Sequence, residues 1–134
     1  MSAAEKIEPT ISETLIIVEA VVKGPRGMTT GKFVVDTGTS LTTMIPELAD
    51  SIGYSARDAF RRTRVHTAIG EEEGYGLRVA ELTVLGFTMS SFPVSVFDLG
   101  HDGIDGLLGM NFLCDFNVDI RPAEHRLLVE RIAP

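Results

Sequence analysis

The residues best suited to chemistry are a carboxylate, a glycine and three hydroxyls that follow an apolar run at positions 33–35: Asp36, Thr37, Gly38, Thr39 and Ser40. An aspartate at the end of an apolar strand is costly unless hydrogen-bond donors surround it. The hydroxyls can donate here, and Gly38 permits a tight turn that exposes backbone N–H groups. The pattern indicates a carboxylate held in a fixed, partly dry setting. The same triplet also occurs in ordinary turns, so a second feature is needed.

A second segment, Asp-Gly-Leu-Leu-Gly-Met-Asn-Phe-Leu, occupies positions 105–113. Together the two segments resemble the aspartic peptidases of the single-lobe, retropepsin-like kind, and they look closer to prokaryotic members than to viral ones. In that family a hydrophobic-hydrophobic-Asp-Thr-Gly-x-Ser segment carries the catalytic aspartate. A later apolar-apolar-Gly segment crosses behind it and leads into a short helix. The resemblance covers most of the chain, from about Thr14 to Ile132, but only these two motifs are specific.

The resemblance implies a role for each residue of the first motif. Asp36 would be catalytic, Thr37 would hydrogen-bond across a dimer axis, and Gly38 would let backbone and substrate approach closely. Thr39 would donate its hydroxyl to the outer carboxylate oxygen, and Ser40 would lie where the substrate backbone binds. The second motif implies structural residues that hold the crossing segment: Leu107, Leu108, Gly109 and Asn111.

One departure concerns the dimer. Retroviral relatives typically carry Asp at the Ser40 position and Arg at the Met110 position, and these two side chains pair to brace the dimer. Both positions are uncharged here. Because both charges are absent together, neither position would leave an unpaired buried ion at the interface. The change is therefore compatible with a folded dimer, although it does not imply the retroviral mode of dimerisation.

Peptide hydrolysis by this chemistry needs two carboxylates that share one proton, because two anions about 3 Å apart cannot both ionise. The chain has a single Asp-Thr-Gly segment. We therefore expect an aspartic endopeptidase that acts on a peptide or protein substrate as a C₂ homodimer, with one Asp36 from each subunit. Two alternatives remain at this point: a non-catalytic module of the same fold that binds peptides or dimerises, and a glycosidase that pairs Asp36 with Asp105.

Short apolar runs separated by turn signals predict a mostly β chain, closed as a retropepsin-like β-barrel with one or two short helices. Residues 10–23 and 30–35 predict a hairpin that delivers Asp36, and residues 46–52 and 55–60 predict short helical segments. Strands at 64–68 and 77–82 flank a Gly- and Glu-rich connection, and by resemblance this hairpin is the flap that closes over substrate, with Ile69, Gly70 and Gly74 in contact with it. An ordinary exposed hairpin is the alternative.

Length and composition are those of one globular domain over residues 1–134, with residues 1–10 expected to be disordered. The net charge of −7 disfavours nucleic acid and anionic membranes as partners. We expect no membrane-spanning segment, no metal and no cofactor, since the three histidines are scattered. Cys114 is the single cysteine and is expected in the core. A cytoplasmic location is the default expectation, although a removed signal or anchor segment would leave the same sequence.

Overall fold

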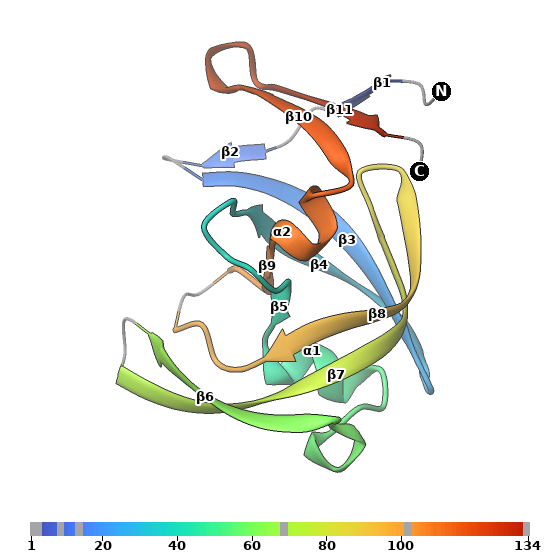
Figure 1. Ribbon diagram of the computed structural model, residues 1–134, viewed down its shortest axis with the longest axis vertical. Coiled ribbons are helices and arrows are strands. Elements are labelled where there is room, and N and C mark those ends of the chain that lie inside the picture. The colour runs from blue at the N-terminus through green and yellow to red at the C-terminus, as the bar shows by residue number, and fades with distance from the viewer. Residues whose placement is uncertain (1–3, 8–9, 13–14, 68–69, 101–102, 133–134) are drawn as a thin grey trace.

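Figure 1 shows the computed structural model, which describes residues 4–7, 10–12, 15–67, 70–100 and 103–132. Strands dominate it and form two sheets. In chain order the strands are β1 (Ala4–Ile7), β2 (Thr10–Ser12), β3 (Leu15–Gly24), β4 (Gly27–Val35), β5 (Thr43–Met44), β6 (Arg61–Thr67), β7 (Gly70–Val84), β8 (Phe87–Val96), β9 (Gly106–Leu108), β10 (Phe116–Arg121) and β11 (Arg126–Arg131). The helices are α1 (Pro46–Ser51), α2 (Met110–Leu113) and the 3₁₀ turns η1 (Ala56–Asp58) and η2 (Pro122–Glu124).

The larger sheet has the strand order β2-β3-β4-β9-β5-β8-β7-β6, and β3 also pairs with β7. Hydrogen bonding therefore runs round a closed ring of β3, β4, β9, β5, β8 and β7. The pairs β4–β9 and β5–β8 are parallel, and the other pairs in this sheet are antiparallel. The mostly β architecture predicted from the sequence, with two short α-helices, is confirmed.

The hairpin of β3 and β4 brings the chain to Asp36, as predicted. Its register runs from Ile17 opposite Val34 to Gly24 opposite Gly27. Gly27 has φ of +120°, a backbone conformation that glycine adopts without a steric penalty. The alternating buried and exposed residues of β3 and β4 place one face of the hairpin in the core.

Strand β9 passes between β4 and β5, far apart from both in sequence (Figure 1). It starts at Gly106, which has no room for a side chain. A Cβ there would collide with the ring of Phe33 and lie 2.5 Å from the carbonyl oxygen of Thr43. The glycine at this position therefore lets β9 approach its two neighbours closely.

Strands β7 and β8 form one long hairpin that turns at Leu85 and Gly86. Both residues have positive φ, +56° and +83°, as a two-residue type I′ connection requires. The apolar run over residues 82–87 looks like one strand in the sequence, but this turn divides it. The apolar Leu85 concealed the turn, because its side chain is buried although its backbone is left-handed.

The smaller sheet has the order β1-β11-β10. Its strands β10 and β11 form a hairpin near the C-terminal end of the described residues. Disorder was expected for residues 1–10, but Ala4–Ile7 pair with residues 127–130 of β11, and Thr10 begins β2. The partner of β1 lies far away in the sequence, so a local pattern could not reveal that strand, whereas β2 pairs with the adjacent strand β3.

The helical segments follow their local signals. Pro46 occupies the first turn of α1, and Gly53 beyond its end has φ of +94°. In η1 the Asp58 carboxylate accepts a hydrogen bond from the Ser55 backbone N–H at 2.9 Å. Cys114, expected in the core, is instead exposed at the end of α2.

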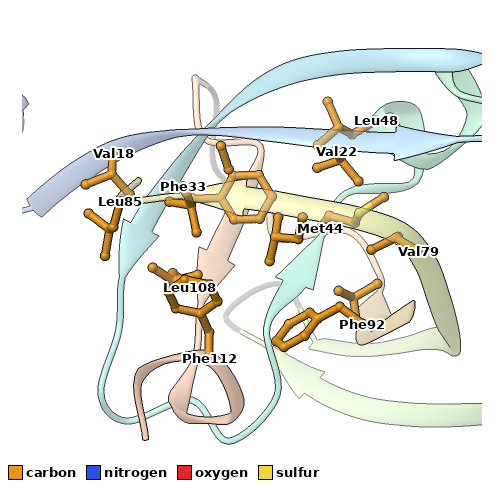
Figure 2. Packing of buried hydrophobic residues seen from close by; sticks show 14 of the residues in the cluster. Val18, Val22, Phe33, Met44, Leu48, Val79, Leu85, Phe92, Leu108 and Phe112 are labelled. Atoms are coloured by element: carbon orange, nitrogen blue, oxygen red, sulfur yellow. The ribbon is translucent and has the colours of Figure 1, made fainter. Parts of the chain in front are cut away.

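One hydrophobic cluster unites both α-helices with strands of both sheets (Figure 2). Phe33, Met44 and Leu108 lie at its centre, where β4, β5 and β9 meet, and each is at most 1% exposed. The ring of Phe112 from α2 stacks on Phe116 of β10 with centroids 5.1 Å apart. None of the described helices has the length and apolar character needed to cross a membrane.

Met44 offers a test of this core, because the same residue type occurs exposed at Met28. Met44 is 1% exposed and Met28 is 65% exposed. We expect Met44→Ala to lower the free energy of unfolding by about 2–5 kcal/mol, through lost burial and a cavity. Met28→Ala should change it by less than about 0.5 kcal/mol. Urea unfolding measures the free energy of unfolding of both variants. Equal losses of stability would contradict the placement of Met44, and so of β5, at the centre of the core.

Candidate active site

Asp36 directly follows β4, and its backbone N–H donates to the carbonyl oxygen of Leu108 at 3.0 Å. Its carboxylate accepts two hydrogen bonds from its own turn. The backbone N–H of Gly38 donates to Oδ1 at 2.9 Å, and the hydroxyl of Thr39 donates to Oδ2 at 2.7 Å. Each oxygen therefore has one donor, and the half-buried carboxylate keeps lone pairs available to solvent or substrate.

The turn itself is compact. The backbone N–H of Thr39 donates to the carbonyl oxygen of Asp36 at 3.2 Å, which closes the turn. A Cβ on Gly38 would lie 3.3 Å from the Asp36 Oδ1, so a side chain there would crowd the carboxylate. Thr37, Gly38 and Ser40 are exposed.

The N-terminal end of α2 supports this turn from behind. The backbone N–H of Met110 donates to the Thr39 carbonyl oxygen at 2.7 Å, and that of Asn111 donates to the Ser40 carbonyl oxygen at 2.9 Å. A Cβ on Gly109 would lie 2.8 Å from the same Thr39 oxygen. The two sequence motifs therefore meet, and Gly109 allows the contact.

Leu107, Leu108, Gly109 and Asn111 all contribute to this support. Leu107 and Leu108 pair with Val34 and Val35, the last residues before Asp36. Leu108 is fully buried, and Leu107 is partly exposed.

Sequence reasoning missed Thr42, which is fully buried. Its hydroxyl donates to Asn111 Oδ1 at 2.8 Å and accepts from the Gly109 backbone N–H at 3.1 Å. In the sequence, a threonine between Leu41 and Thr43 looks like an ordinary strand residue. The available signal was the cost of burying its hydroxyl, which needs a partner.

The hairpin of β6 and β7 carries the residues expected to contact substrate. Gly70 is exposed at the start of β7 with φ of +117°, and it pairs with Thr67. Ile69 lies outside the described residues. Gly74 pairs with Thr63, and a Cβ there would lie 2.7 Å from the Val96 carbonyl oxygen.

An open cavity of about 320 Å³ lies along this hairpin. It is lined by Arg62, Thr63, Arg64, Glu73 and Gly74. Gly74 thus borders open space as well as β8, and its predicted role in substrate contact stays a prediction.

The three glutamates at 71–73, expected at the exposed tip of a connection, are instead part of β7 and lie opposite β6. Arg64 contacts Glu71 at 2.8 Å and Glu73 at 3.4 Å, and all three side chains are exposed. Alternation along the strand places Glu71 and Glu73 on one face and Glu72 on the other. The cross-strand contacts with Arg64 accompany the backbone pairing of this segment, and sequence reasoning missed both.

Tyr75 lies at the base of the same hairpin, opposite Arg62. Burial raises the pKa of its phenol, and the negative charges of Asp50 and Asp58 raise it further. The hydroxyl therefore stays protonated at neutral pH and adds no charge to the hairpin.

Asp105 does not join Asp36. Its carboxylate accepts from the Lys32 backbone N–H at 2.8 Å, and its own N–H donates to the Lys32 carbonyl oxygen. Lys32 precedes Asp36 by four residues on β4, so the two aspartates are anchored about 13 Å apart at about 3.3 Å per residue. Paired carboxylates of glycosidases lie about 5–9.5 Å apart. The structure does not favour the glycosidase alternative.

Ser40 and Met110, which stand where retroviral relatives have an ion pair, are both exposed, and Met110 is 39% exposed. Among the described residues, no group of three or more His, Cys, Asp or Glu side chains is arranged to hold a metal ion.

Comparison with solved structures shows the same fold in three proteins. A retropepsin-like aspartic protease from Rickettsia conorii matches with a TM-score of 0.70 and 20% identity, over 100% of this chain and 97% of its own. EIAV protease, solved with the inhibitor HBY-793, matches with a TM-score of 0.59 and 17% identity, over 79% of this chain and 91% of its own. The retroviral protease-like domain of Ddi1 from Leishmania major matches with a TM-score of 0.58 and 16% identity, over 92% of this chain and 97% of its own.

A comparison with curated proteins finds no match. The structural similarities establish a retropepsin-like fold, as predicted from the two motifs. The family model described as aspartyl protease matches residues 18–112, a range that contains Asp36, its turn and the crossing strand β9. The chain therefore belongs to the aspartyl protease family.

Proposed function

We propose that this protein is an aspartic endopeptidase that acts as a homodimer, with Asp36 of each subunit in one shared active site. The observation that carries the proposal is the state of the Asp36 carboxylate. It is held by Gly38 and Thr39 at the end of a buried strand, yet it is only half-buried. A carboxylate in a purely structural role would be expected to face donors on all sides.

The dimer follows from the count of suitable carboxylates. The chain has one Asp-Thr-Gly segment, and the other aspartate that was considered, Asp105, is anchored away from the turn. A two-fold axis beside the turn would bring a second Asp36 close to the first. The exposed Thr37, Ser40 and Met110 next to the turn support such a contact, in which uncharged groups would meet.

The reaction would proceed by general acid–base catalysis. One Asp36, ionised, takes a proton from a water molecule, whose oxygen attacks the scissile carbonyl carbon. The other Asp36, protonated, gives its proton to the carbonyl oxygen and forms a tetrahedral diol. The Asp36 that took the proton from water then gives it to the peptide nitrogen, while the other Asp36 takes a proton back from a hydroxyl of the diol. The C–N bond breaks, which releases a carboxylic acid and an amine and restores the dyad. The Thr39 hydroxyl and the Gly38 N–H stabilise the ionised form, because both donate to the carboxylate.

We also propose that the β6–β7 hairpin is a flap that covers the substrate. Its support is positional, since the hairpin extends from the sheet and ends in the short connection between Thr67 and Gly70 (Figure 1). The exposed ion pairs of Arg64 with Glu71 and Glu73 link its two strands. Exposed pairs of this kind contribute little to stability, so the two strands of the hairpin are held together mainly by their backbone pairing.

The alternative function is a non-catalytic peptide-binding or dimerisation module. The uncharged Ser40 and Met110 motivate it, because they depart from the retroviral pattern. For location we propose the cytoplasm, where an exposed free thiol such as Cys114 stays reduced.

Asp36→Asn tests the catalytic assignment. We expect the rate of cleavage of an unfolded protein substrate to fall by about 10²- to 10⁴-fold, because the proton-transfer group is lost. Dimer mass by sedimentation should be unchanged, since Asn keeps the shape. Asp50→Asn on the exposed face of α1 is the matched control and should keep wild-type activity. Retained activity in the Asp36 variant would contradict catalysis by a pair of Asp36 carboxylates. An inactive wild type would favour the non-catalytic module.

A mixing experiment tests the shared site. Equal amounts of wild type and Asp36→Asn, allowed to exchange subunits, should give about half the activity of the wild type alone, because mixed dimers lack one acid. Activity independent of the added variant would mean that each subunit works alone.

Arg64→Gln tests the hairpin ion pairs. We expect the free energy of unfolding to fall by less than about 1 kcal/mol, and the difference should shrink in about 1 M salt because exposed charges are screened. Amide hydrogen exchange should increase in β6 and the first half of β7. A large loss of stability that is insensitive to salt would show that the pairs support the fold instead of the hairpin alone.

A further inference from the structure

We infer that Asn111 and Thr42 form a hydrogen-bonded relay that positions the Thr39 hydroxyl on Asp36, and that the chain needs this relay for catalysis beyond its contribution to folding. The inference rests on the proposed function and concerns the same active site. Neither side chain touches Asp36, so both are positioning residues.

The Asn111 carboxamide joins three separate segments of the fold. Its Oδ1 accepts from the Thr42 backbone N–H and from the Thr42 hydroxyl, both at 2.8 Å. Its Nδ2 donates to the Pro93 carbonyl oxygen of β8 at 2.9 Å. The backbone N–H can only donate and the carbonyl can only accept, so the two ends of the side chain are not interchangeable. An amide therefore fits this position. A carboxylate would place one of its oxygens against the Pro93 carbonyl oxygen, and neither atom could donate a hydrogen bond.

The Thr42 hydroxyl continues the relay. Because it donates to Asn111 Oδ1, its lone pairs are available to the Gly109 backbone N–H, which lies 3.1 Å away. Thr42 and Gly109 are both buried, so water cannot replace either partner readily. The relay therefore fixes the position of residues 109–111 relative to Thr42.

Residues 109–111 in turn hold the catalytic turn. Met110 N–H and Asn111 N–H donate to the carbonyl oxygens of Thr39 and Ser40 at 2.7 and 2.9 Å. Thr39 thus links α2 to the carboxylate: its carbonyl accepts from α2, and its hydroxyl donates to Asp36 Oδ2 at 2.7 Å. A shift of α2 relative to Thr42 would pass through Thr39 to the carboxylate. Small displacements matter, since about 1 Å of misplacement can reduce a rate about a hundredfold.

Thr42→Val is the central variant, because it keeps the shape and removes only the hydroxyl. We expect kcat to fall about tenfold or more with KM within about twofold of wild type, since substrate contacts are unchanged. The acid limb of the pH–rate profile should move to higher pH. A weaker hydrogen bond from Thr39 favours the ionised carboxylate less, so the base form appears only at higher pH.

Two variants control this result. Thr42→Ser restores the hydroxyl and should return the acid limb to the wild-type position. Thr83→Val makes the same substitution at the exposed hydroxyl pair of Thr83 and Thr88, near the β7–β8 turn, and should leave kcat and the profile unchanged. Asn111→Gln keeps the amide but displaces it by one methylene, and we expect the same changes as for Thr42→Val.

All variants are compared at a temperature at which circular dichroism shows each to be folded. A folded Thr42→Val or Asn111→Gln with wild-type kcat and an unmoved acid limb would overturn the inference. So would an equal loss in Thr83→Val, or a failure of Thr42→Ser to restore the limb. These results require an active wild type, whereas a wild type without peptidase activity would contradict the proposed function instead.

Discussion

The Asp36 carboxylate must be kept at the end of a buried strand, and hydrogen bonds from Gly38 and Thr39 meet that requirement. These hydrogen bonds are made in a tight turn, and the backbone carbonyl groups of that turn then need hydrogen-bond donors of their own. The first backbone N–H groups of α2, which have no partner within the helix, supply these hydrogen bonds. The need for donors at one carboxylate thus explains why two segments far apart in sequence must meet.

The meeting depends on close backbone approach, and two glycines allow it. Gly106 lets β9 fit between β4 and β5, and Gly109 lets α2 touch the catalytic turn. A Cβ at either position would lie within 3 Å of backbone atoms, a distance that forces the strands or the turn apart. Parallel pairing of β4 with β9 then fixes Leu108 beside Asp36. The apolar-apolar-Gly motif is therefore a packing requirement of the site.

Local chemistry decided which features could be predicted from the sequence. The hairpin before Asp36, the α1 start at Pro46 and the crossing strand all have strong local signals, and the structure contains them. Features set by distant partners were missed. The strand over residues 4–7 depends on β11, which lies at the other end of the chain. The strand structure of Glu71 and Glu73 was missed for another reason: their partner Arg64 is only seven and nine residues away, but adjacent glutamates between glycines resemble a solvated connection. Thr42 was missed because its partners lie more than sixty residues away.

The contacts that hold the Asp36 turn come from its own subunit, whereas the second carboxylate of the proposed active site would come from another copy. The core, the closed ring of strands and all the hydrogen bonds to the Asp36 turn described above are made within one subunit. The proposed chemistry requires a second carboxylate in addition. Association would therefore control the proposed activity, and the net charge of −7 on each copy would oppose it at low salt. Uncharged contacts such as Met110 would avoid adding to that repulsion.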